Sequence, residues 1–430
     1  MNKIENNKFE TIKNSKTGAE YTKIIHKSGL TVLVWKMEGF STTEALFGTK
    51  YGSINTRFKT WKDADFTAVP EGIAHFLEHK LFENEDCDVF EQFAKIGSQA
   101  NAFTTFDKTC YLFSCTDNYL QSLEILLDFV QDPHFTDENI AKEQGIIAQE
   151  IKMTNDNPSW IVFFNLLKAM YYEHPVRIDI AGTTDSILKI DKDLLYKCYN
   201  TFYNLPNMVL AIAGNVDAED IIKIADEHLK PASDLEVESE FLPEPETVVK
   251  KEVKAALPVG LPLFQIGYKC NPLSGIENLK AELTANIVAN IISSETSPLY
   301  QRLLDMGLIN ATFGCEVFNG DGFFSVIFSG ESTDPNAVYD KLNKEIEKLK
   351  SDGLNSEVFD IEKKVIYGSI IKAYNNVEAV AMSLIETYFA GVNPFDTIEV
   401  LSKLTIADAN NFLKEINTDN SAISIVEPLT

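Results

Sequence analysis

Two stretches of this chain repeat the same order of local patterns at a separation of about 210 residues. Each has a short lead, a segment with helical periodicity, a turn rich in asparagine and an apolar, β-rich run, and they cover residues 187–216 and 401–427. Any chain that alternates helices and strands produces some similarity of this kind, but here the order of the elements agrees as well as the local pattern. The repeat therefore predicts two copies of one domain.

The pattern of apolar residues predicts an α+β fold in which each copy packs helices on an antiparallel-rich sheet. Runs rich in β-branched and aromatic residues predict strands at residues 31–36, 44–53, 99–115 (as two strands), 208–216 and 261–270, with a hairpin at 311–330. Helical periodicity predicts helices near residues 118–130, 137–153, 158–172, 192–203, 218–229, 278–294 and 337–353.

Residues 230–252 differ in character from the segments on either side. They are rich in proline and glutamate and have no helical period, which is typical of a linker. We therefore expect an N-terminal domain over residues 1–235, a linker over 236–252 and a C-terminal domain over 253–430.

The composition is that of a globular protein with a strong negative charge. The chain has 430 residues, a hydrophobic share of 45% and a formal net charge of −26. A polyanion of this size repels nucleic acid and anionic membrane surfaces and attracts basic partners, although a generic acidic protein would have the same composition. We therefore expect neither a nucleic-acid partner nor a membrane partner.

Several features of the sequence favour a cytoplasmic protein. The six cysteines are scattered and include no C-x-x-C pair, which predicts reduced thiols. Residues 1–18 are polar and lack the apolar run of a secretory signal. No segment has the roughly 18 consecutive apolar residues that a membrane-spanning helix needs.

The stretch EGIAHFLEHKLFE, residues 71–83, carries the strongest chemical signal in the sequence. On a helix, His75, Glu78 and His79 lie on one side, because residues three and four apart are neighbours. Two imidazoles at this spacing can bind one zinc ion, and Glu78 then lies beside the metal as a general base for its bound water. The alternative is a helix that happens to carry two histidines, but H-x-x-E-H is the known motif of one class of zinc enzymes.

A catalytic zinc site with two histidines needs a third ligand, which is usually a carboxylate. The segment EQGIIAQE places Glu143 and Glu150 seven residues apart, on one face of the predicted helix at 137–153. We expect Glu150 to bind the metal and Glu143 to orient a histidine or Glu78 from the outer shell. The alternative is two solvated glutamates with no metal nearby.

These residues together resemble the pitrilysin/insulysin superfamily of zinc peptidases, which includes the mitochondrial processing peptidases. The similarity rests on HFLEH at 75–79, SQANAFTTFDKT at 98–109, the two glutamates of EQGIIAQE, HPVRIDIAGTTDSI at 174–187 and the duplicated architecture. It covers nearly the whole chain and is closest to two-domain bacterial members of the processing-peptidase branch. The resemblance implies that the two domains form a clamshell chamber.

The resemblance also assigns residue roles. It places His75, His79 and Glu150 at the zinc ligands, Glu78 at the general base and Glu143 at an outer-shell glutamate. It further implies that Asn101 and Ala102 lie on a strand that holds the substrate backbone, as an edge strand can do for an extended peptide. The alternative for Asn101 is a turn residue.

The predicted second copy departs from the family in two ways. Its corresponding helix, ELTANIVANIISS, has no histidine, so this copy is expected to be non-catalytic. Family members often carry an arginine and a tyrosine there that hold substrate, whereas this chain has Leu304 and Asn310 at those positions. Either Arg302, which is close but out of register, substitutes, or a zinc-less homologous subunit supplies the missing pair. We favour the heterodimer, with a homodimer as the other possible assembly.

The sequence thus predicts a zinc metalloendopeptidase that cleaves peptides or unfolded segments held in an extended form. One rival is a non-catalytic peptide-binding or scaffold subunit of the same fold, although such relatives usually have a degraded metal motif. Another is a zinc hydrolase that acts on a substrate other than a peptide. The sequence gives neither the cleavage preference nor the identity of a partner.

Overall fold

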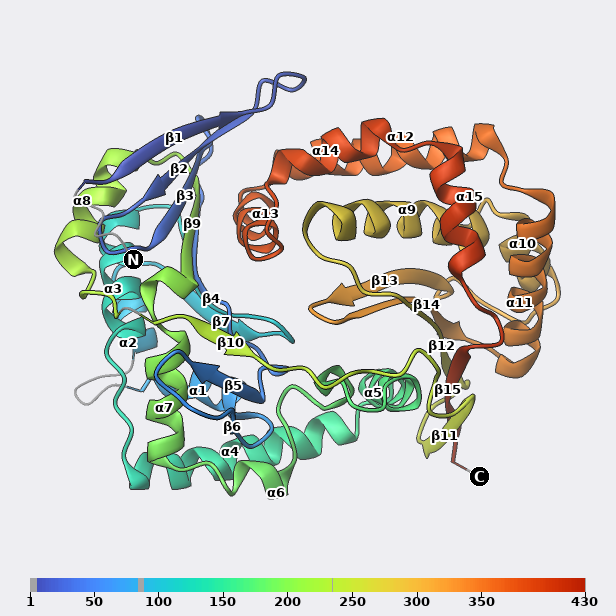
Figure 1. Cartoon of the computed structure of the whole chain (residues 1–430), viewed down its shortest axis with the longest axis horizontal. Coiled ribbons are helices and arrows are strands. Elements are labelled where there is room, and N and C mark those ends of the chain that lie inside the picture. Colours follow the sequence, from blue (N-terminus) through green and yellow to red (C-terminus); the bar gives the residue numbers. More distant parts are fainter. Residues whose placement is uncertain (1–5, 84–88, 234, 430) are drawn as a thin grey trace. The chain divides into compact units, whose positions relative to one another are not determined.

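Figure 1 shows the chain as a computed structural model, which describes residues 6–83, 89–233 and 235–429. The chain divides into two compact units. The first comprises Met1–Gln149, Asp179–Glu240 and Ile371–Phe395. The second comprises Glu150–Ile178, Phe241–Ile370 and Asp396–Thr430. Three helices, α4, α12 and α14, continue across the breaks between these segments.

The first unit is built on a seven-stranded sheet and a small three-stranded sheet. In spatial order, the strands of the larger sheet are β1 (Lys8–Lys13), β2 (Glu20–Ile25), β3 (Thr31–Lys36), β9 (Met208–Gly214), β4 (Thr43–Thr49), β8 (Thr109–Cys115) and β7 (Gln99–Thr104). Among the strands that the structure describes in this unit, only β3 and β9 pair in parallel. The small sheet contains β10 (Val237–Ser239), β5 (Arg57–Thr60) and β6 (Thr67–Ala68).

Helices from both halves of the sequence complete the first unit. They are α1 (Ile73–Leu81), α2 (Val89–Lys95), α3 (Tyr119–Val130), α4 (Asp137–Asn155), α6 (Thr184–Ile187), α7 (Lys192–Phe202), α8 (Ala218–His228) and α13 (Val377–Phe389), with a 3₁₀ turn at Leu205–Asn207.

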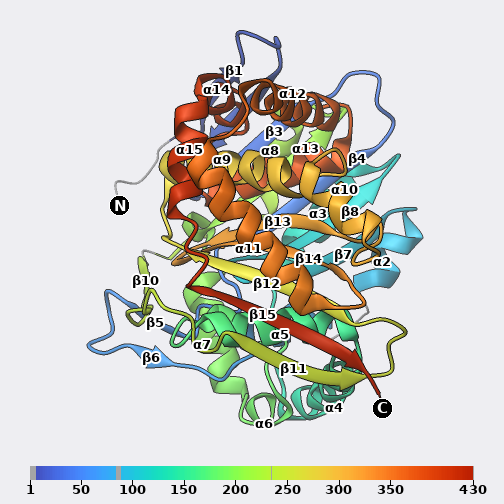
Figure 2. The same ribbon diagram turned by 90° about the vertical axis from the view of Figure 1, so that its right-hand side faces the viewer.

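The second unit is built on a five-stranded sheet, whose strands lie side by side in Figure 2. In spatial order they are β11 (Glu252–Leu257), β15 (Ser421–Pro428), β12 (Leu263–Cys270), β14 (Phe323–Glu331) and β13 (Gly314–Gly320). The helices are α5 (Pro158–Met170), α9 (Gly275–Ser293), α10 (Pro298–Asp305), α11 (Pro335–Asp352), α12 (Ser356–Ala373), α14 (Pro394–Lys403) and α15 (Ile406–Glu415), with a 3₁₀ turn at Pro175–Arg177.

Alternation along β12 explains the layers of the second unit. Phe264, Ile266 and Tyr268 point to one face, where they join a buried core with apolar residues of α9, α10, α11 and α15. The opposite face packs on α5. A Cβ atom at Gly267 would lie only 2.3 Å from the Sδ atom of Met170, so glycine at this position lets α5 approach the sheet closely.

The two sheets confirm the predicted repeat, because five consecutive strands have the same topology in each. The order β3-β9-β4-β8-β7 corresponds to β11-β15-β12-β14-β13. In each case the first pair is parallel and the others are antiparallel. The predicted α+β class with two homologous layered domains is therefore confirmed, whereas the clamshell chamber stays a prediction.

Two helices are exchanged between the halves of the sequence, which nothing in the sequence suggested. Helix α13, from the C-terminal half, packs Val380, Leu384 and Ile385 into the core of the first unit, against the face of β3, β4 and β9. Helix α5, from the N-terminal half, covers β11, β12 and β15 of the second unit. The expected sequential domains, 1–235 and 253–430, stay a prediction.

The predicted linker over 236–252 is mostly irregular but contains the short strand β10, which pairs with β5. The described cysteines Cys110, Cys115, Cys198, Cys270 and Cys315 are free thiols, as expected, and Cys87 lies outside the described residues. Within the described part of the chain, no helix is both long and apolar enough to cross a membrane.

Candidate metal centre

Helix α1 presents one polar side and one apolar side. Its apolar side chains Ile73, Phe76, Leu77 and Leu81 are buried in the first unit. His79 and Glu78, on the other side, are only partly buried. Because the apolar stripe fixes the rotation of the helix, it determines which way the polar side chains point.

The start of α1 is held by a close contact with a later loop. Gly72 caps the helix with a φ of +85°, and a Cβ atom there would lie 2.3 Å from the carbonyl oxygen of Ala181. On the facing loop, a Cβ atom at Gly182 would lie 2.5 Å from the Glu71 carbonyl oxygen, and the Ser186 hydroxyl donates a hydrogen bond to the same carbonyl. Part of the segment HPVRIDIAGTTDSI therefore serves to position the histidine helix.

His75, His79 and Glu150 come together, as predicted. Each offers one ligand atom, and these atoms all lie within 4.8 Å of one another. The two imidazole rings are 4.6 Å apart between centroids and inclined by 65°. Among the residues that the structure describes, this is the one cluster of histidine, cysteine and carboxylate side chains arranged to hold a metal.

The electrostatics of the site favour a neutral imidazole at His75. Burial, together with the smaller effect of the neighbouring His79, lowers the pKa of His75 to about 3. A buried imidazole that resists protonation keeps a lone pair for a metal ion.

Glu143 lies behind the histidines on α4. Its side chain is buried, and its Oε1 atom is 3.0 Å from Nδ1 of His79. A carboxylate in this position accepts a hydrogen bond from Nδ1 and leaves Nε2 of His79 for a metal. The alternative of two solvated glutamates on α4 is wrong for Glu143, because this residue is only 6% exposed.

Glu78 has a partner that the sequence did not reveal. The hydroxyl of Thr104, at the end of β7, donates a hydrogen bond of 2.6 Å to Oε2 of Glu78. A threonine in a β-rich run looks like an ordinary strand residue, so no sequence signal marked it.

Asn101 and Ala102 lie in the middle of β7, which is the last strand in the sheet order. The alternative of a turn residue is therefore wrong for Asn101. Its side chain is exposed, and its Oδ1 atom accepts a hydrogen bond from the backbone N–H of Ala102 at 2.9 Å. The predicted role of these residues in binding substrate stays a prediction.

Arg302, the candidate substitute for the family's arginine, and Asn310, at the position of the family's tyrosine, lie in the second unit. Arg302 on α10 forms an ion pair with Glu345 of α11, and its side chain is half exposed. Asn310 donates a hydrogen bond to Glu331. Neither contact decides whether Arg302 binds substrate, so that role stays a prediction.

The second unit repeats the helix of the metal centre without its ligands. Helix α9 occupies the place of α1 in the repeated order of elements and carries Asn286 and Asn290 at the same four-residue spacing. Each asparagine side chain donates to the backbone carbonyl four residues earlier. The expected absence of histidine from this helix follows from the sequence itself.

The donor set of His75, His79 and Glu150 suits zinc. Two imidazole nitrogens and one carboxylate oxygen form the usual protein half of a catalytic zinc site, which keeps one position for water or substrate. Glu143 adds the outer-shell carboxylate that such histidines commonly have. The residues present therefore fit a zinc ion better than magnesium or calcium, which prefer oxygen ligands alone.

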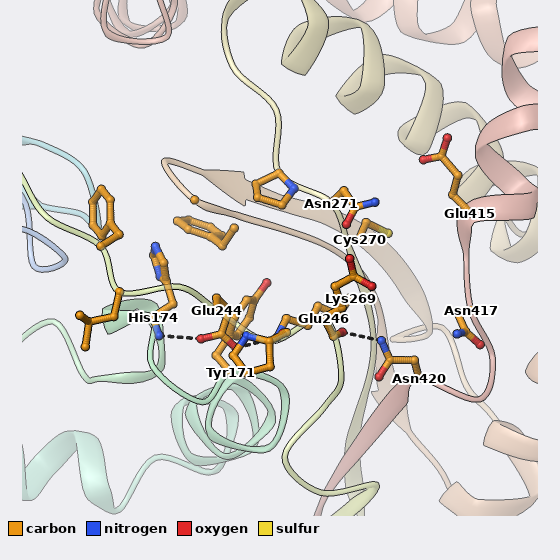
Figure 3. A pocket seen from close by; sticks show the side chains of 16 residues that line it. Tyr171, His174, Glu244, Glu246, Lys269, Cys270, Asn271, Glu415, Asn417 and Asn420 are labelled. Carbon is orange, nitrogen blue, oxygen red and sulfur yellow. Dashed lines mark hydrogen bonds and ion pairs between the residues drawn. The ribbon is translucent and has the colours of Figure 1, made fainter.

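A separate cavity of about 380 Å³ lies within the second unit (Figure 3). It is lined in part by Lys269, whose Nζ atom is 2.6 Å from Oε1 of Glu244 and 4.8 Å from the ring centre of Tyr171. The same ammonium group donates to the backbone carbonyls of Met170 and Pro245.

The carboxylate of Glu244 also has several hydrogen-bond partners. It accepts hydrogen bonds from the backbone N–H groups of Tyr172, Glu173 and His174. Burial acts to raise the pKa of Glu244, but these bonds and Lys269 outweigh it and lower the pKa. The ion pair therefore fastens the turn after α5 to residues 244–247 and has little capacity left for a ligand.

The sequence matches known families over most of its length. Residues 67–184 match the family described as insulinase (peptidase family M16), and residues 189–366 match the family described as the peptidase M16 inactive domain.

Two relatives match nearly the whole chain, and a third matches part of it. "Uncharacterized zinc protease YmfH" of Bacillus subtilis (strain 168) is 41% identical over 407 residues, which are 93% of this chain and 95% of the relative. A crystal structure described as M16-like, from Alicyclobacillus acidocaldarius, is 34% identical with a TM-score of 0.91, covering 99% of this chain and 100% of that one. The β subunit of the mitochondrial processing peptidase of Caenorhabditis elegans is 28% identical over 263 residues, which are 60% of this chain and 55% of the relative.

Proposed function

This chain belongs to the insulinase family of peptidases, M16, and from that premise we propose that it is a zinc metalloendopeptidase which cleaves peptides in an extended form. The observation that carries the proposal is the meeting of His75, His79 and Glu150 within 4.8 Å. A non-catalytic family member has no need of an intact ligand set beside a carboxylate such as Glu78.

The roles of the residues follow from their positions. His75, His79 and Glu150 would hold the metal, and Glu143 fixes the ring of His79. When bound, zinc polarises the scissile carbonyl and makes a water molecule more acidic. Glu78 takes the proton of the attacking water and passes it to the amine nitrogen as the C–N bond breaks.

Strand β7 would hold the substrate. It is the last strand of its sheet, and within the described residues only its β8 side is paired. An extended peptide can add to such an edge through main-chain hydrogen bonds, with Asn101 and Ala102 alongside. Recognition would then depend on backbone more than on side chains, which suits a peptidase for unfolded segments.

The direct test compares the wild-type chain with Glu78→Gln in zinc content and in cleavage of a mixed peptide pool. We expect Glu78→Gln to keep its zinc and to lose hydrolysis by about 10²- to 10⁴-fold, which is the usual contribution of a general base. Full activity in Glu78→Gln would refute the mechanism. Zinc binding without any turnover in the wild type, with every partner tested, would favour the peptide-binding or scaffold alternative.

A heterodimer remains the favoured assembly in this proposal. Two observations support it. The chain has Leu304 and Asn310 where the family's arginine and tyrosine are expected. It is also similar to a relative that is named as one subunit of a processing peptidase. We expect the purified chain to gain activity when it is co-expressed with a zinc-less homologue. Equal activity of the chain alone would instead favour Arg302 as the substitute, either in a monomer or in a homodimer.

A further inference from the structure

The hydrogen bond between Thr104 and Glu78 links two parts of the site that have separate tasks. Thr104 is the last residue of β7, and its Oγ1 atom lies 2.6 Å from Oε2 of Glu78 on α1. A carboxylate can only accept, so the single hydroxyl hydrogen of Thr104 points to Glu78. Hydrogen bonds to a charged group are short and strong, so this bond restrains the orientation of the carboxylate.

The opposite strand supports Thr104 from behind. Thr109 of β8 is its register partner, and the Thr109 hydroxyl donates to the carbonyl oxygen of Tyr51 at 2.9 Å. Thr109 is fully buried, whereas Thr104 is half-buried. The hydroxyl that meets Glu78 therefore belongs to a strand end that is anchored in the core of the first unit.

Alternation along β7 places Thr104 on the face toward α1. Ala100 and Ala102 share that face, because side chains two residues apart point the same way in a strand. Phe103 points to the other face, where it packs against the core that includes α13. The two alanines before the threonine are small, which suits the contact between α1 and β7, and the threonine adds a hydroxyl group on the same face.

We propose that Thr104 is a positioning residue which couples the strand that binds the peptide to the general base. This inference rests on the proposed peptidase function. A peptide that pairs with the edge of β7 stiffens the strand that carries Thr104, so substrate binding and the orientation of Glu78 are set by the same element. In this role Thr104 acts through Glu78 and not on the substrate directly.

The experiment compares Thr104→Val, which keeps the shape and removes the hydroxyl, with Thr104→Ser, which keeps the hydroxyl. Thr11→Val, at an exposed position on β1, is the control for the same substitution in a strand. We expect Thr104→Val to keep the zinc content and a KM within about twofold, with kcat lower by about 10- to 100-fold. Thr104→Ser should recover kcat to within about threefold of the wild type.

A double-mutant cycle separates positioning from a general effect on the strand. In the Glu78→Gln background, Thr104→Val should change the residual rate by less than about twofold, because there is no longer a base to orient. An unchanged kcat in Thr104→Val would overturn the proposal. So would a failure of Thr104→Ser to recover activity, or an equal loss of rate in the Glu78→Gln background.

Crystal structures of the zinc-loaded variants give a readout that does not depend on turnover. The Glu78 carboxylate should keep its orientation in the wild type and in Thr104→Ser, and should change its rotamer or become disordered in Thr104→Val. An unchanged Glu78 in Thr104→Val would overturn the positioning role even if the wild type hydrolyses no peptide. If the wild type is inactive but Glu78 moves as expected, the proposed function fails and the positioning role stands.

Discussion

The Nδ1 atom of His79 lies 3.0 Å from Oε1 of the buried Glu143, and this pair joins the histidine helix to α4. The contact fixes which ring nitrogen of His79 faces the metal position. We expect Glu143→Ala to weaken zinc binding by about 10- to 100-fold, as loss of an outer-shell partner usually does. Glu143→Gln should weaken it less, because the amide oxygen can still accept a hydrogen bond. Competition with a chelator of known affinity measures the zinc affinity of both variants.

The matched control is Glu138→Gln, which removes a carboxylate from the exposed first turn of the same helix. It should leave zinc affinity unchanged. If Glu143→Ala binds zinc as tightly as the control, the contact with His79 has no part in holding the metal.

Removal of zinc should leave the fold intact. Helix α1 is held by Ile73, Phe76, Leu77 and Leu81 in the core and does not depend on its polar side for packing. We expect the chelated protein to keep its far-UV circular dichroism, and added zinc to raise the unfolding midpoint by ligand binding alone.

A variant that lacks one of the proposed zinc-binding side chains completes the metal test. Zinc should no longer raise the midpoint of His79→Gln, whereas it should raise that of Glu78→Gln as in the wild type. Unfolding on chelation, as in a zinc finger, would contradict the view that apolar packing holds α1.

Which side chains share a face of α1 and of α4 could be predicted from the sequence, because that information is local to each helix. The spacing of His75, Glu78 and His79 places them on one side of any helix, and Glu143 and Glu150 share a face for the same reason. The apolar positions of the two segments also predicted that both helices are half-buried. What the sequence could not show was the role of Thr104, since strand residues with hydroxyl groups are common and their partners lie on distant elements.

The exchange of α5 and α13 illustrates a second limit. Helical periodicity predicted a helix at 158–172 close to the observed Pro158–Met170, but periodicity shows only that a face is buried and not what covers it. Strands β1 and β2 were not predicted, and for β1 the reason is exposure and not burial. β1 is largely exposed, so the run KFETIK shows little of the apolar alternation that marks a strand.

Gly72 offers a test of how the start of α1 is held. Gly72→Ala adds a Cβ atom 2.3 Å from the carbonyl oxygen of Ala181, at a φ of +85°. We expect it to lower the free energy of unfolding by more than about 2 kcal/mol, because strain and a backbone clash act together. Gly97→Ala is the control, since Gly97 has a φ of +78° but no atom within 4 Å of its Cβ position.

Gly97→Ala should cost only about 1 kcal/mol, the price of the left-handed conformation alone. Chemical denaturation of both variants measures the difference, and zinc content shows whether the histidines are displaced. Equal costs for the two variants would mean that the loop around Ala181 moves aside and does not fix α1.

His174 should make the stability of the protein depend on pH. Burial lowers its pKa to about 4, although a hydrogen bond from Nε2 to the Asp321 carbonyl acts to raise it. Its Nδ1 atom accepts a hydrogen bond from the backbone N–H of Val176, so a proton added at Nδ1 would break this bond. The unfolded chain binds that proton near pH 6.5, so this contribution is complete above pH 6.5 and is lost as the pH falls toward 4.

The expected loss from this one group is about 2 kcal/mol between pH 7 and pH 5. Between pH 7 and pH 5, the free energy of unfolding of His174→Gln should fall by about 2 kcal/mol less than that of the wild type. This comparison holds whatever the stability of the variant at pH 7. His134→Gln, in the loop between α3 and α4, controls for the removal of a histidine as such. Urea titrations at the two pH values decide the matter, and a fall in His174→Gln as large as in the wild type would assign the pH dependence to other groups.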